Sequence, residues 1–119
     1  MSGYRFELKD GAVDKIDVLT CAVVSRHSPV GTKVVQVLAK GNCLIIREDY
    51  YQFPQGSSNI YCLNQDLELL WEADLPSPTD VYANALIDRG NTLECGSWEG
   101  SDCVLDPETG KMIRNVFGK

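Results

Sequence analysis

The chain has 119 residues, of which 44% are hydrophobic and 24% charged; this composition is typical of an ordinary globular domain and argues against a disordered chain. Its formal net charge of -6 argues against nucleic acid and membranes as partners, because both are bound through clustered Lys and Arg. The opening MSGYRFELKD has no basic stretch followed by an apolar run, and no segment approaches the roughly 18 apolar residues of a membrane span, so we expect a cytoplasmic protein.

Short β-rich runs between turn residues dominate the chain, and helical periodicity is poor. Gly, Asn and Pro in the intervening turns favour a meander of antiparallel hairpins. One alternative is a helix over residues 77–88, with Ser77 as its cap and Pro78 in its first turn. The strands that we expect are Arg5–Leu8, Val34–Leu38, Cys43–Arg47, Ile60–Leu63, Leu67–Glu72, Tyr82–Ile87, Thr92–Ser97, Cys103–Leu105 and Lys111–Val116.

An internal repeat organises most of these strands. Residues 28–45 align without a gap with residues 77–94, and both segments share a Ser-Pro opening and a later Gly-Asn-x-Leu turn. The repeat continues from Ile60–Asn64 to Asp102–Asp106, with seven extra residues in the first unit, within the segment 48–58. We therefore expect a single domain over residues 1–119, made of a partial unit (1–27) and two repeats (28–76 and 77–119).

The repeat resembles that of pyrroloquinoline-quinone-like β-propellers. The resemblance is carried by the Ser-Pro openings, by Gly90-Asn91-Thr92-Leu93, by the last hairpin Val104–Lys111, and by the closing Leu70-Trp71-Glu72. It implies an all-β fold of antiparallel four-stranded propeller-blade-like repeats. The adjacent cysteine pair and the calcium-binding carboxylates of the quinone enzymes are missing, so the resemblance implies no cofactor. The alternatives are a β-trefoil or an open β-sandwich.

Several residues are weighed as sites and set aside. The five cysteines have no CxxC spacing, and we expect thiols, including Cys95 and Cys103, which flank one hairpin. The lone histidine, His27, is interpreted as a surface loop residue. The acidic residues Asp102, Asp106 and Glu108 lack the spacing of a calcium loop, so no metal site is expected.

The inserted segment 48–58 is the best candidate site. Long loops on rigid sheets often carry recognition, and Tyr offers both an apolar face and a polar tip. Trp98 lies at the corresponding hairpin of the second unit, where it is positioned to join that surface. The candidate partner-binding residues are therefore Tyr50, Tyr51, Phe53 and Trp98.

These observations favour a small non-enzymatic interaction module, with another protein as its partner. One alternative is a carbohydrate-binding protein or an enzyme that uses the aromatic segment 48–58. Another is an acidic inhibitor or immunity-type protein, which the charge and size suggest. Because a closed ring needs at least about four blades, sheet edges and blade faces should stay uncovered, and we expect a homo-oligomer.

Overall fold

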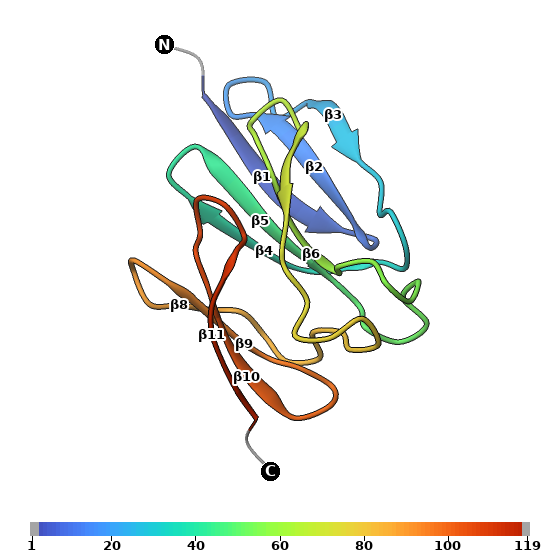
Figure 1. The fold of residues 1–119 in the computed structure, drawn as a ribbon. Coiled ribbons are helices and arrows are strands. Elements are labelled where there is room, and N and C mark those ends of the chain that lie inside the picture. The colour runs from blue at the N-terminus through green and yellow to red at the C-terminus, as the bar shows by residue number, and fades with distance from the viewer. Residues whose placement is uncertain (1–2, 118–119) are drawn as a thin grey trace.

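The computed structural model describes residues 3–117, which form three antiparallel sheets (Figure 1). The first sheet has three strands in the order β1-β2-β3, and the other two have four each, in the orders β4-β5-β6-β7 and β11-β10-β9-β8. The first sheet lies within residues 4–27, the second within 28–76 and the third within 77–117. The strands are β1 (Tyr4–Lys9), β2 (Ala12–Asp17), β3 (Val23–His27), β4 (Val34–Lys40), β5 (Cys43–Glu48), β6 (Ile60–Leu63), β7 (Leu69–Glu72), β8 (Ile87–Asp88), β9 (Leu93–Gly96), β10 (Ser101–Leu105) and β11 (Met112–Phe117).

The sheets confirm the predicted all-β, blade-like architecture. Tight turns set the hairpins: Gly41 and Gly90 both have positive φ, of 61° and 88°, as the repeated Gly-Asn turns require. No helix forms over residues 77–88, so that alternative is wrong. Among residues 3–117, the structure contains no helix of the length and apolarity that a membrane span needs.

The second sheet is the middle layer of the stack and is buried on both faces. Side chains alternate along β5, so Leu44 and Ile46 face the first sheet and Ile45 faces the third. The first interface, which we call the first seam, has an apolar cluster that includes Val13 and Val34. The second seam, between the second and third sheets, has a larger apolar cluster. The molecule is elongated, 49 × 30 × 19 Å, as an open stack of three sheets should be.

The predicted strand Tyr82–Ile87 is wrong in most of its length. Only its last residue enters β8, and Tyr82 makes one isolated bridge. Side chains from the second sheet form hydrogen bonds with the backbone N–H and C=O groups that a neighbouring strand would otherwise use. Gln36 accepts from the Leu86 N–H at 2.8 Å and donates to its carbonyl at 3.0 Å. The two segments equated by the repeat, Val34–Leu38 and Tyr82–Ile87, therefore differ in secondary structure although their sheets share one strand order.

The first sheet has no fourth strand, and this defines the most open part of the fold. β1 and β2 lie against β4, and the end of β3 reaches β6 through a hydrogen bond between His27 and Tyr61. Among the described residues, the first sheet has no fourth strand that could lie opposite β7 on this side. As a result, Leu69 of β7 is 57% exposed, and no described residue pairs with the second edge of β3.

Candidate functional site

A buried carboxylate organises the outer part of the first seam. Glu48 ends β5 and continues the alternation of Leu44 and Ile46, so its side chain lies on their face. It accepts hydrogen bonds from the backbone N–H groups of Val30, Gly31 and Thr32 at 2.8, 3.0 and 3.0 Å. These three donors fix the loop that joins the first sheet to the second.

The Tyr61 hydroxyl, from β6, is the fourth donor to Glu48. Burial acts to raise the pKa of the Glu48 carboxyl, but the hydrogen bonds from Thr32, Tyr61, Val30 and Gly31 outweigh burial and hold that pKa below its usual value. Burial, reinforced by the bond to the Glu48 anion, raises the pKa of the Tyr61 hydroxyl. The carboxylate is thus an anion held by four hydrogen bonds.

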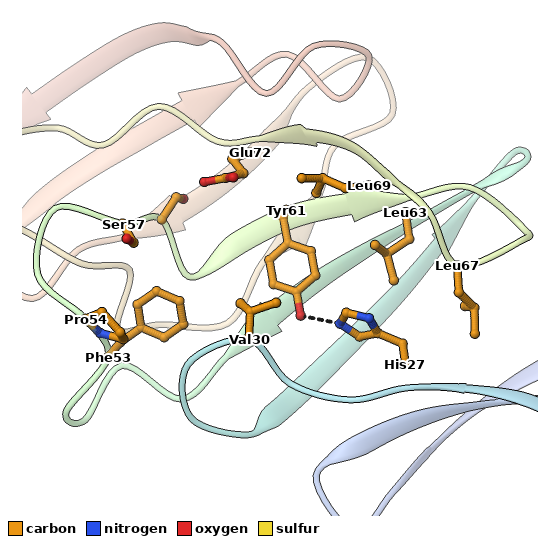
Figure 2. Close-up of a pocket in the computed structure, with 11 residues that line it drawn as sticks. His27, Val30, Phe53, Pro54, Ser57, Tyr61, Leu63, Leu67, Leu69 and Glu72 are labelled. Carbon is orange, nitrogen blue, oxygen red and sulfur yellow. Dashed lines mark hydrogen bonds between the residues drawn. The ribbon is translucent and has the colours of Figure 1, made fainter.

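His27 extends this network toward solvent. Its Nε2 lies 2.7 Å from the Tyr61 hydroxyl oxygen, and the two rings meet edge to face (Figure 2). Because Tyr61 donates its proton to Glu48, its oxygen accepts from His27, which places the ring proton on Nε2. Burial lowers the pKa of His27 although the Glu48 charge opposes this, so the ring is neutral near pH 7. The loop interpretation of His27 was wrong: it is the last residue of β3 and pairs with Val13.

A pocket of about 320 Å³ opens beside this network, where the first sheet lacks a fourth strand. Glu72 supplies the one acidic side chain of its lining; no Lys or Arg is among the lining residues. Tyr61 and Glu72 are cross-strand partners, so both side chains stand on the same face of the second sheet. The lining is His27, Val30, Phe53, Pro54, Ser57, Ser58, Tyr61, Leu63, Leu67, Leu69 and Glu72.

Phe53 forms the wall of this pocket nearest the 30–33 loop (Figure 2). The ring packs so closely on Gly31 that a Cβ there would lie 2.6 Å from a ring carbon. A glycine is therefore needed at position 31, because a side chain there would prevent the close approach of the Phe53 ring. Glu48 holds the same residue from its other side through the N–H, so the buried network and the pocket wall meet at one backbone position.

The other predicted aromatics are not among the residues that line the pocket, and two of them stack on each other. Tyr50 stacks on Trp98, with ring centroids 5.2 Å apart and planes 23° apart. Tyr51 and Trp98 are 67% and 65% exposed. We call Tyr50, Tyr51 and Trp98 the aromatic surface. Phe53 is directed into the pocket, so the four predicted residues divide between two neighbouring features.

Both turns that carry the aromatic surface are anchored. The Asp49 carboxylate accepts from the Tyr51 N–H at 3.1 Å, and the Thr32 hydroxyl donates to the Asp49 carbonyl at 2.6 Å. On the third sheet, buried Asp80 accepts from the Glu99 N–H at 3.0 Å, and the Trp98 N–H donates to the Val81 carbonyl at 2.8 Å. The rings are therefore presented by turns with fixed backbones.

Sequence reasoning missed three residues of the site: Glu48, Tyr61 and Glu72. The alternation of side chains along β5 could have identified Glu48, because residues 44, 46 and 48 lie on the same face of the strand. No signal in the sequence announces Glu72 as a pocket residue, because its exposure depends on a strand that the first sheet lacks.

The cysteines and acidic residues stay apart from this site. Cys95 and Cys103 are cross-strand partners, as their spacing predicts, and both are free thiols in the structure. Burial raises the pKa of Cys95 to about 12, so its thiol is a packing group. Within residues 3–117, no three His, Cys, Asp or Glu side chains gather in a way that could hold a metal ion.

A family model described as "Domain of unknown function (DUF7957)" matches residues 19–117, and the chain belongs to that family. No curated protein matches the chain.

Solved structures that share the fold include two computationally designed proteins and one natural propeller. The alignment with the designed Ika4 protein covers 98% of this chain and 68% of the Ika4 chain, at 19% sequence identity and a TM-score of 0.71. The alignment with the designed Ika8 protein covers 98% of this chain and 33% of the Ika8 chain, at 19% sequence identity and a TM-score of 0.67. The alignment with the β-propeller domain of Myceliophteria thermophila Cps50 (Swd1) covers 99% of this chain and 40% of the Cps50 chain, at 12% sequence identity and a TM-score of 0.66.

These likenesses establish a propeller-like arrangement of sheets and nothing of function. The chain spans about a third of the length of Ika8 and less than half of the Cps50 domain that it matches.

Proposed function

We propose that this chain, a member of the family described as a domain of unknown function (DUF7957), is a small non-enzymatic module that binds another protein. The observation that carries the proposal is the aromatic surface, in which Tyr50 stacks on Trp98 beside exposed Tyr51. Trp and Tyr are enriched among the residues that dominate protein interfaces, since they contribute large contact areas with few rotatable bonds.

The anchoring of the two turns supports this proposal. A surface that is ordered before binding loses less conformational entropy when the partner arrives. The buried network supports a structural role for the polar residues nearby, because four donors already occupy Glu48. Tyr61 stands between His27 and that carboxylate, so Glu48 is not free to exchange a proton with a substrate.

The pyrroloquinoline-quinone-like resemblance is carried over only as blade architecture. Our proposal therefore includes no quinone and no other cofactor.

The test uses a displayed library of random peptides, selected on the immobilised protein, with a glycan array probed in parallel. We expect selected peptides to bind and Trp98→Ala to weaken them by about tenfold or more. Ile113→Ala is the matched control, because Ile113 is also an exposed apolar residue, at 57%, on the third sheet. Glycan binding without peptide binding would reject the proposal. Peptides that ignore both Trp98→Ala and Tyr51→Ala would reject the aromatic surface as the binding site.

We also infer self-association through the outer face of the third sheet. Ile87 and Val116 are 45% and 50% exposed there, and their cross-strand partners Glu94 and Asp102 add charge to the same face. Exposed apolar residues rimmed by polar ones are typical of contact surfaces between chains. Sedimentation over a range of concentrations tests this; a monomer at every concentration contradicts it.

A further inference from the structure

We propose that an extended segment of a partner protein adds to the free edge of β3 as the missing fourth strand of the first sheet and places a Lys or Arg side chain in the pocket against Glu72. This inference rests on the proposed function, since it assumes a protein partner. It assigns that partner a conformation and a charge.

The sheet topology provides the first support. The second and third sheets each end in a fourth strand that runs antiparallel to the third, β7 beside β6 and β11 beside β10. The first sheet stops at β3, whose second edge is unpaired among residues 3–117. An unpaired strand edge offers N–H and C=O groups to any extended peptide, and β-strand addition uses such edges.

The uncovered face of β7 provides the second support. A strand added beside β3 would lie opposite β7, over Leu69 and Glu72, since β3 itself already reaches β6. Alternate side chains of that strand would point into the pocket. The pocket of about 320 Å³ is at the small end of the range for ligand sites, which suits single side chains better than a whole cofactor.

The charge of the pocket selects a cation. Glu72 makes no ion pair among residues 3–117, and the other titratable lining residues, His27 and Tyr61, are uncharged near pH 7. The remaining walls are mostly apolar and include the rings of Phe53 and Tyr61. Lys and Arg combine an aliphatic stem with a cationic end, so they match these walls and this carboxylate. The net charge of -6 favours the same partners at long range.

The probe is the peptide acetyl-Thr-Val-Thr-Lys-Thr-Val-Thr-amide, added to isotope-labelled protein and followed by NMR. We expect shifts in the backbone amides of Val23–His27 and in the methyl groups of Leu67 and Leu69. An otherwise identical peptide with norleucine in place of Lys should bind about fivefold more weakly, because it keeps the stem and loses the charge. High salt should reduce that difference.

Two controls separate the parts of the proposal. A Lys peptide with backbone N-methyl groups at alternate residues should lose binding, because it cannot pair with β3. Glu72→Gln should weaken the Lys peptide about fivefold and leave the norleucine peptide unchanged. Asp102→Asn removes the same charge from an exposed site on the third sheet and should change neither.

The proposal is overturned if norleucine and Lys peptides bind equally, if N-methylation has no effect, or if the shifts lie away from β3 and the pocket. Association of the protein with itself through β3 in place of peptide binding, seen by sedimentation, also overturns it. If library peptides still depend on Trp98 while the Lys peptide fails, only this inference falls. If no peptide from the library binds, the proposed function falls with it.

Discussion

The two faces of β7 meet different surroundings, although they belong to one short strand. On the second seam, Trp71 packs against Gly110, just before the third sheet's fourth strand, and joins the same apolar cluster as Met112. On the first seam, Leu69 and Glu72 face a pocket, because the first sheet ends after three strands. The comparison teaches that the candidate site arises from an incomplete neighbouring sheet rather than from an unusual sequence in β7.

Polar residues act differently in the two seams as well. In the second seam, Asn59 and Gln36 bind backbone groups of the third sheet directly and join the sheets. In the first seam, Glu48 holds a loop, and His27 reaches Tyr61 at the pocket wall. The predictions below compare the seams, from the largest expected effect to the smallest.

Glu48→Ala should lower the free energy of unfolding by about 3–5 kcal/mol, because three backbone N–H groups and one hydroxyl lose their common acceptor inside the protein. Urea unfolding measures the change. A loss below about 1 kcal/mol would show that water replaces the carboxylate freely and that the loop is not held by Glu48.

Asn59→Ala tests the second seam in the same way. Asn59 is fully buried, donates to the carbonyls of Glu48 and Tyr82, and accepts from the Tyr82 N–H. Its removal should lower the free energy of unfolding by about 2–3 kcal/mol, measured by urea unfolding. Because Asn59 faces away from the pocket, binding of the Lys peptide should be unchanged; a large change in binding would mean that the two seams are coupled.

Gly31→Ala should destabilise the fold by about 1–3 kcal/mol, because the added methyl group overlaps the Phe53 ring and must displace it. Gly41→Ala is the comparison: it has open space around it and only the strain of a φ of 61°, so about 1 kcal/mol is expected. Thermal unfolding and NMR of the Phe53 ring measure both. Equal losses with an unmoved ring would contradict the close contact.

The first seam should also make the stability of the protein depend on pH at mild acidity. The folded-state pKa of His27 lies below its ordinary value of 6.5, so the unfolded chain takes up the proton first and stability falls as the pH drops through 6.5. The contribution of Glu48 is present above 4.5 and disappears only at lower pH, because its folded-state pKa is lowered. His27→Gln, which keeps a donor for Tyr61, should remove the first slope; urea midpoints between pH 7 and 5 measure it, and an unchanged slope contradicts the assignment.

Trp98→Ala should have the smallest effect on stability, within about 0.5 kcal/mol, because the side chain is 65% exposed and its turn is held by backbone contacts and Asp80. Its effect should instead be on binding. A loss of stability above about 1 kcal/mol would identify the Tyr50–Trp98 stack as part of the fold.

Local sequence determined the elements and the order of the two complete sheets. Gly41 and Gly90 take the positive φ that ends a hairpin, and the apolar runs between such turns become strands, because both choices depend on residues a few positions apart. The repeat of Ser-Pro and Gly-Asn therefore predicted the blade-like units. The same logic failed over Tyr82–Ile87, where side chains from a distant sheet occupy the backbone.

Tertiary structure decided the pocket and its network. The repeat indicated that Trp98 and the 48–58 segment share a surface, whereas the stacking of Trp98 on Tyr50 depends on the packing of the second sheet against the third. His27 and Tyr61 meet across the first seam, and the pocket exists because no described strand covers the outer part of β7. Sheet stacking is set by the burial of whole apolar faces, so it brings together side chains that no local pattern links.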